Sequence, residues 1–152
     1  MCSVVFLVAC TSKEAPSQMG ESVSVEEIKN LPQDDSWNNK PVSFEGCFGF
    51  CDMINSFKAG SKAKLRITTE PDCKGDRLID AKISIQLSGS SVIFGVAPRN
   101  QIVADKDLNM ETLKVITDDY QKVDYQKFIF SGNLIYDEGK YYLDNVTIHL
   151  IK

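Results

Sequence analysis

Three cysteines are the residues of this chain whose type and spacing best suit covalent chemistry. Cys47 and Cys51 stand four positions apart, and Cys73 follows in a later polar segment. In an extended strand, residues four apart are separated by about 13 Å, at roughly 3.3 Å per residue, whereas the Cα atoms of a disulfide lie within about 7 Å. Pairing Cys47 with Cys51 therefore requires a bend, for which Gly49 is the candidate. Pairing either one with Cys73 requires its segment to fold back. An oxidising compartment favours some disulfide, and the sequence leaves its partners open.

The same cysteines indicate a second chemistry, because thiolate and thioether ligands select Cu(I) and Met53 lies nearby. An envelope thiol-redox or copper-handling protein that uses Cys47, Cys51 and Cys73 is therefore the alternative function. No second group of soft ligands accompanies them in the sequence, and the intervening Phe48 has the pattern of a core residue. The leading hypothesis is that the chain binds no metal or cofactor.

Catalytic motifs are missing from the sequence. It has one histidine, His149, and no nucleophile elbow, His-Glu-x-x-His motif, phosphate-binding loop or dinucleotide fingerprint. Since hydrolases at neutral pH usually recruit histidine or a metal, we interpret His149 as a rim residue on the last strand. The segment from Asp105 to Asn109 begins like a calcium loop, but Met110 replaces the required Gly and Ile116 the required Glu. It is predicted to be a solvated acidic turn, and the protein is predicted not to be an enzyme.

Basic residues alternate with apolar ones along two segments, 62–69 and 79–87. This period of two is typical of half-buried strands. If the two strands are adjacent, their outward side chains form one cationic surface, the predicted ligand-binding site: Lys62, Lys64, Arg66, Lys82 and Gln86. Such a surface suits an anionic glycan, a phosphate or an acidic protein partner. The alternative is a solvated edge that lysines keep soluble. A nucleic-acid partner is not expected, because no aromatic side chain stands among these charges.

The elements that position these residues are mostly strands. Ser24 and Glu27 form a capping box for a short helix over residues 25–31, which Pro32 ends. We predict a strand over 42–51 with a bend at Gly46, and then a meander through the two basic strands, joined by a turn-rich loop over 70–76. Residues 88–111 are predicted to be irregular, with 92–96 a short strand or a helical turn. Two hairpins follow, over 113–123 and 128–151.

Length and composition fit one globular domain. The chain has 152 residues, 43% of them hydrophobic and 25% charged, with a net charge of −4. These values exclude a membrane channel, a coiled coil and a disordered protein. A domain of this size buries roughly 70% of its unfolded surface, so it needs neither a metal nor a disulfide for its core. The acidic balance also argues against general binding to nucleic acids or anionic membranes.

The N-terminus carries the features of an export signal. Residues 1–9 are apolar and uncharged, and the run is less than half the length of a membrane-spanning helix. Leu7-Val8-Ala9-Cys10 resembles the lipobox of bacterial lipoproteins, which implies cleavage before Cys10 and acylation of that cysteine. Signal peptides begin with Lys or Arg, so this leader looks truncated. Residues 10–22 are polar and are predicted to be a flexible tether. The alternative is a buried N-terminal strand, residues 4–8.

Residues 23–152 resemble the small OB-fold lipoproteins of Gram-negative, Bacteroides-like bacteria. The likeness lies in the helix that leads into the strand from Lys40 to Gly46, and in the closing hairpin with Gly132 and Gly139. It implies a mainly β, OB-fold-like, five-stranded, partly open Greek-key barrel with a short N-terminal helix. A small β-sandwich is the rival architecture.

The resemblance and the N-terminal signal together give the predicted function. The chain is expected to be a lipid-anchored, noncatalytic binding or assembly module of the Gram-negative cell envelope. We favour the outer membrane, because Thr11 after Cys10 does not resemble the aspartate that retains some lipoproteins at the inner membrane. The ligand, the oligomeric state and the leaflet stay open.

Overall fold

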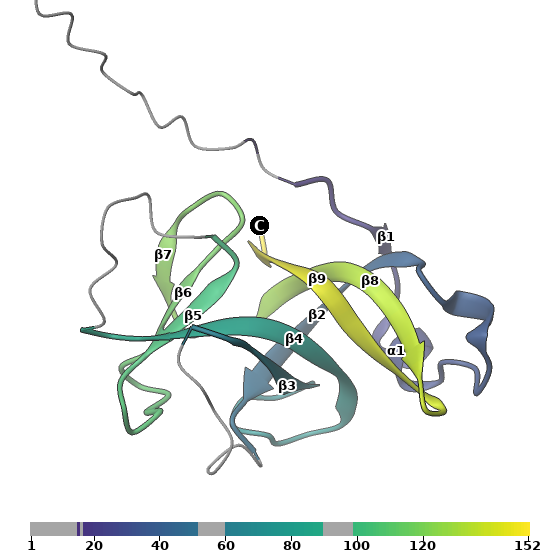
Figure 1. The fold of residues 1–152 in the computed structure, drawn as a ribbon, viewed down its shortest axis with the longest axis horizontal. Helices are drawn as coiled ribbons and strands as arrows, with labels where there is room; N and C mark the ends of the chain where they lie inside the picture. The colour runs from purple at the N-terminus through teal and green to yellow at the C-terminus, as the bar shows by residue number, and fades with distance from the viewer. Residues whose placement is uncertain (1–14, 16, 52–59, 90–98) are drawn as a thin grey trace, which may run out of the picture.

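Five long strands form a closed barrel (Figure 1). The computed structural model describes residues 15, 17–51, 60–89 and 99–152. The barrel strands are β2 (Pro41–Gly49), β3 (Lys62–Thr68), β4 (Arg77–Leu87), β8 (Phe128–Asp137) and β9 (Lys140–Leu150). Backbone pairing runs β2, β3, β4, β9, β8 and back to β2. The predicted OB-like barrel is confirmed, and the closed ring excludes two separate sheets.

The seam between β4 and β9 is the narrowest part of this ring. The two strands are parallel and share only two residue pairs, Asp80 with Tyr142 and Ala81 with Leu143. All the other neighbours in the ring are antiparallel. The ring of pairing is therefore closed, and it has the fewest residue pairs between the third and fifth barrel strands, β4 and β9.

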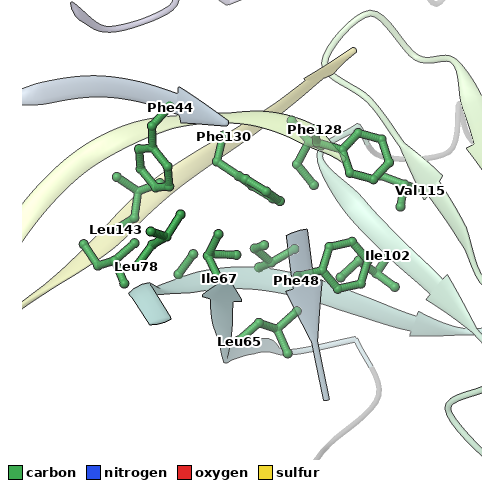
Figure 2. Packing of buried hydrophobic residues seen from close by; sticks show 14 of the residues in the cluster. Phe44, Phe48, Leu65, Ile67, Leu78, Ile102, Val115, Phe128, Phe130 and Leu143 are labelled. Carbon is green, nitrogen blue, oxygen red and sulfur yellow. The ribbon is translucent and has the colours of Figure 1, made fainter. Parts of the chain in front are cut away.

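The apolar positions of the alternating strands fill the barrel (Figure 2). Leu65 and Ile67 of β3 are fully buried, as the period of two predicts. Phe48, Phe128 and Phe130 are also fully buried, and their rings pack against one another with centroids 6.3 to 6.4 Å apart. This shared aromatic core holds β2 against β8.

The short helix α1 (Val25–Lys29) covers one part of the barrel at β4 and β2. Both hydrogen bonds of the predicted capping box are present, from the Glu27 backbone to Ser24 Oγ and from the Ser24 backbone to the Glu27 carboxylate. Ile28 is 1% exposed and joins the core. The helix ends earlier than the predicted residue 31, and a 3-10 turn, η1 (Asp35–Trp37), follows it.

Three short strands extend the sheet beyond β4: β5 (Gln101–Ala104), β6 (Lys114–Ile116) and β7 (Lys122–Asp124). The predicted hairpin of β6 and β7 is confirmed. The prediction of irregular structure over residues 88–111 is wrong at β5, which pairs in parallel with the end of β4. Four residues are too few for a period to be recognised. Strand β5 forms because its backbone pairs with β4 and β6. Residues 92–96 lie outside the described part.

The segment before α1 lies on the barrel. Strand β1 (Glu21–Ser22) pairs in parallel with β2, and Gly20 N donates to Ser131 Oγ at 2.8 Å. The last residues of the predicted tether, 17–22, are therefore held against β2 and β8. The predicted leader and Cys10 lie outside the described residues. Within the described residues, no helix has the length and apolar character needed to cross a membrane.

Candidate ligand-binding face

The register of β3 and β4 brings the predicted site residues onto one outward surface. Lys64 stands directly opposite Lys82, and Lys62 opposite Ser84. Arg66 lies opposite Asp80, so a carboxylate interrupts the cationic surface at that end. The side chains of Lys62 and Lys64 are exposed, whereas those of Arg66 and Lys82 are half-buried.

Gln86 lies further along β4, on the same outward alternation. It is paired with Val103 of β5 rather than with a residue of β3. Its side-chain amide borders Gly60, where the chain enters β3. Gln86 therefore marks the end of the surface that is remote from the β8–β9 turn.

Tyr142 is the aromatic residue of this surface, and it comes from a third strand. The Nζ atoms of Lys64 and Lys82 each lie 4.4 Å from the centroid of its ring. Lys82 also donates to the Tyr142 hydroxyl at 3.2 Å. Two ammonium groups on directly opposed residues repel each other, and the electron-rich ring between them offsets this repulsion. We call Lys62, Lys64, Arg66, Lys82, Gln86 and Tyr142 together the basic face.

The neighbours of Lys82 stabilise its protonated form. Its hydrogen bond to Tyr142, together with the charge of Asp144, raises the pKa of Lys82 above its ordinary value of 10.5. Asp144 Oδ2 lies 3.8 Å from Lys82 Nζ. Lys82 therefore stays protonated at neutral pH, and its head group is held beside the ring.

Sequence reasoning missed Tyr142 because it considered only the two basic strands. The period of two along the last strand would have assigned Tyr142 to the outward side. Which strand lies beside β4 is a matter of topology, and the parallel seam of β4 with β9 supplied that neighbour. The prediction that no aromatic residue stands among the charges is correct for β3 and β4 alone and wrong for the assembled face.

A hollow of about 190 Å³ opens at the Tyr142 end of the basic face. Lys64, Tyr142 and the residues around the β8–β9 turn line it. Arg77 and Asp80 line it as well and form an ion pair, with Nη2 to Oδ2 at 2.6 Å. The hollow thus combines aromatic, cationic and anionic groups, which suits a polar ligand with both an acidic group and hydroxyl groups.

No family model, curated protein or solved structure matches this chain. Its likeness to OB barrels therefore rests on its own strand order and on the parallel seam between β4 and β9. In OB barrels generally, the face of the second and third strands, with the loops beside it, binds oligonucleotides and oligosaccharides. Here those strands are β3 and β4.

The cysteines form a separate cluster at the end of β2. Cys51 and Cys73 are joined by a disulfide with their Cα atoms 5.7 Å apart, one of the pairings that the sequence left open. A Cβ on Gly49 would overlap Cys73 Sγ, so glycine at this position lets the two loops close. Cys47 is a free, buried thiol. Burial raises the pKa of Cys47 above its usual 9.0, against the opposing effects of Lys127 and Tyr125.

The other candidate residues lie apart from the basic face. His149 is on β9 opposite Ile129, where burial lowers its pKa and its Nε2 lies 2.8 Å from Thr147 Oγ1. Asp105 accepts hydrogen bonds from the backbone N–H groups of residues 107 and 109, so the predicted acidic turn is present. Within the described residues, no three His, Cys, Asp or Glu side chains converge as metal ligands would. Met53 lies outside those residues.

Proposed function

We propose that the chain is a noncatalytic binding module of the bacterial cell envelope whose basic face holds an acidic glycan. The supporting observation is the position of Tyr142 against the ammonium groups of Lys64 and Lys82. An aromatic ring offers an apolar surface on which the face of a sugar ring packs. The ammonium groups offer charge-assisted hydrogen bonds to a carboxylate or sulfate on the same sugar. Together they recognise both parts of an acidic sugar.

A binding role is also supported by how two carboxylates beside the basic face, Asp80 and Asp144, are used. Asp80 is paired with Arg77 at 2.6 Å, and Asp144 lies 3.8 Å from Lys82. Each of these carboxylates therefore holds a cation in place. A general acid or base must instead reach and exchange a proton with the substrate. The local geometry favours recognition over proton transfer.

We propose that Cys10 carries a lipid anchor, so that the barrel is displayed at a membrane surface and, by preference, at the outer membrane. The support is the lipobox-like run from Leu7 to Cys10. Several acyl chains on one cysteine anchor a protein far more firmly than a single chain. Mass spectrometry of the protein from its native cells tests this: an unmodified N-terminus at Met1 contradicts it.

The glycan proposal is tested by screening the full-length chain on an array of acidic and neutral glycans. We expect the chain to be retained on acidic glycans. Tyr142→Ala should weaken binding at least tenfold, about 1.4 kcal/mol, because it removes the packing surface. Lys64→Glu combined with Lys82→Glu should abolish binding by reversing the charge.

The matched control is Lys122→Glu. Lys122 is exposed on β7, away from the basic face, and its substitution should leave retention unchanged. Failure of the unaltered chain to bind any acidic glycan contradicts the proposal, as does equal loss in Lys122→Glu. Retention of an acidic protein in place of every glycan would assign the face to a protein partner.

The alternative function, thiol-redox or copper handling, depends on the state of the cysteines. Cu(I) binds thiolates, but two of the three candidate sulfurs are joined as Cys51–Cys73, and only Cys47 among the three is a free thiol. Copper handling therefore needs this disulfide to be reduced. Titration with Cu(I) before and after reduction, with thiols counted in parallel, separates the functions. Tight binding by the reduced chain would favour copper handling over glycan binding.

A further inference from the structure

Carboxylates gather at one end of the basic face. Asp137 and Glu138 are both exposed, and they line the same hollow as Lys64 and Tyr142. Lys64 lines this hollow as well, and so do Lys140 and the ion pair of Arg77 with Asp80. Because Asp137 and Glu138 outnumber Lys140 at the β8–β9 turn, a ligand that extends past Lys64 toward the turn meets a small excess of negative charge.

A second hollow lies beside the first, toward helix α1. This second hollow has a volume of about 280 Å³. Both hollows are lined by Arg77, Asp80, Lys140 and Tyr141, so they are neighbours, and we call the two together the groove. The other lining residues of the second hollow include Lys29, Gln33 and apolar residues of the α1 region. Two neighbouring hollows offer space for more than one sugar unit.

The carboxylate end of the groove is held in position by aromatic contacts. The hydroxyl of Tyr141 accepts a hydrogen bond from Trp37 N at 2.9 Å and donates one to the backbone oxygen of Asp34. Its ring lies 5.0 Å from the ring of Tyr136 on β8. The turn itself is tight, with positive φ at Glu138 and Gly139. Preorganised groups discriminate between ligands better than mobile ones.

The charge pattern restricts the glycan that fits. Carboxylates accept hydrogen bonds from sugar hydroxyls, but they repel a second acidic group brought beside them. Building on the proposed function, we propose that the ligand is a glycan in which an acidic unit is followed by an uncharged one. The acidic unit lies against Lys64, Lys82 and Tyr142, and the uncharged unit lies beside Asp137 and Glu138. A chain with an acid on every unit is disfavoured.

Two probes of equal length test this inference on the full-length chain. One is a hyaluronan hexasaccharide, in which glucuronate alternates with N-acetylglucosamine. The other is a hexagalacturonate, which has a carboxylate on every unit. Calorimetry at one fixed ionic strength should give the alternating glycan at least a tenfold lower Kd, since like charges meet only in the other complex.

The double variant Asp137→Asn, Glu138→Gln should remove the discrimination. It keeps the hydrogen-bond acceptors and deletes both charges, so the Kd for hexagalacturonate should fall about tenfold while that for hyaluronan stays within about threefold. The matched control is Asp107→Asn, Glu111→Gln, which makes the same charge change at two exposed residues outside both hollows. This control should keep the original preference.

The outcomes separate the two proposals. If the unaltered chain binds both hexasaccharides equally, the inference about alternation is wrong and the glycan-binding function stands. If the control variant loses the preference as fully as the double variant, the preference reflects net charge and the inference is again wrong. If neither hexasaccharide nor any other acidic glycan binds, the proposed function itself fails. The comparison of the two hexasaccharides uses the unaltered chain, so it does not depend on whether a variant folds.

Discussion

Two outward surfaces of the same barrel differ in how far their side chains are exposed to solvent. On β3 and β4, the outward residues Lys62 and Lys64 are exposed to solvent. Where β2 and β8 pair through Ser43 and Ser131, these outward residues are 5% and 3% exposed. The period of two is equally clear on both surfaces, so periodicity distinguishes inward from outward but does not say which outward surface is open.

The difference arises from what covers β2 and β8. Residues 17–23 run along them, and Gly20 is bonded on both sides: its N–H donates to Ser131 Oγ at 2.8 Å and its C=O accepts from Ser43 Oγ at 3.1 Å. A Cβ on Gly20 would overlap the backbone of Pro41 and Val42. A covered surface needs small side chains that satisfy the covering backbone, whereas an open one tolerates long charged ones.

The covering segment is fastened at Asp118, in the turn between β6 and β7. Asp118 is 0% exposed, and its carboxylate accepts hydrogen bonds from Asn100 Nδ2 at 2.7 Å and from Ser17 N. Arg99 Nε lies 3.6 Å from the same carboxylate, while its Nη1 donates to the Ala15 carbonyl at 2.6 Å. The buried carboxylate of Asp118 thus joins the N-terminal segment to the part of the chain that carries β5, β6 and β7.

The largest effect is expected from breaking this fastening. Asp118→Ala should reduce the free energy of unfolding by about 3 kcal/mol, because it leaves buried donors and a partly buried guanidinium without their partner. Urea denaturation followed by circular dichroism measures the loss. An effect below about 1 kcal/mol would show that the segment is held mainly by its contacts at Gly20.

The same residue makes the fastening sensitive to acid. Burial alone raises the pKa of Asp118, but the hydrogen bonds from Asn100 and Ser17 and the charge of Arg99 outweigh it and bring the pKa below the usual 3.8. The folded state therefore gains stability from ionised Asp118 above about pH 3.8 and loses it as the pH falls through the folded value. The stability gap between the unaltered chain and Asp118→Asn should accordingly narrow between pH 7 and pH 3.

The second effect concerns Cys47, the buried thiol of β2. Its burial and raised pKa leave little accessible thiolate at pH 8. Iodoacetamide should modify Cys47 about 50-fold more slowly in the native chain than in urea, since reaction requires local opening. Mass spectrometry of timed samples gives both rates. Equal rates would mean that this part of β2 is open.

The smallest expected effects are changes in the free energy of unfolding caused by one substitution on each surface. Ser131→Val leaves the Gly20 N–H without its acceptor and should cost about 1.5 kcal/mol of unfolding free energy. Lys62→Ala on the open surface should change it by no more than about 0.5 kcal/mol. Urea titrations of both variants beside the unaltered chain provide the measurement. A loss at Lys62 as large as that at Ser131 would contradict the distinction between open and covered surfaces.

Local features of the structure were predictable because neighbouring residues generate them. The capping box of Ser24 and Glu27 lies within one helical turn, and the alternation of Lys64 with Leu65 lies within one strand. The hairpin turn is local too, because Gly139 readily adopts the positive φ that this tight turn requires. The basic face could be predicted to this extent, as a shared surface of two consecutive strands.

Features that depend on distant pairings were not predictable. Strand β5 exists through its pairing with β4, and Cys73 was one of the two partners that the sequence left open for Cys51. The position of Tyr142 beside Lys64 and Lys82 follows from the parallel seam between β4 and β9. No local pattern specifies which strands become neighbours when a sheet closes.

By itself, the sequence determined the long barrel strands, their inward and outward sides, the short helix, and the cations of β3 and β4, because side-chain periodicity and capping act over a few residues. Only the tertiary structure decided that the ring closes, that Tyr142 joins those cations, that Asp137 and Glu138 line a hollow with Lys64, and that residues 17–23 cover Ser43 and Ser131. These contacts join segments far apart in the chain, and the packing of the whole barrel selects among them.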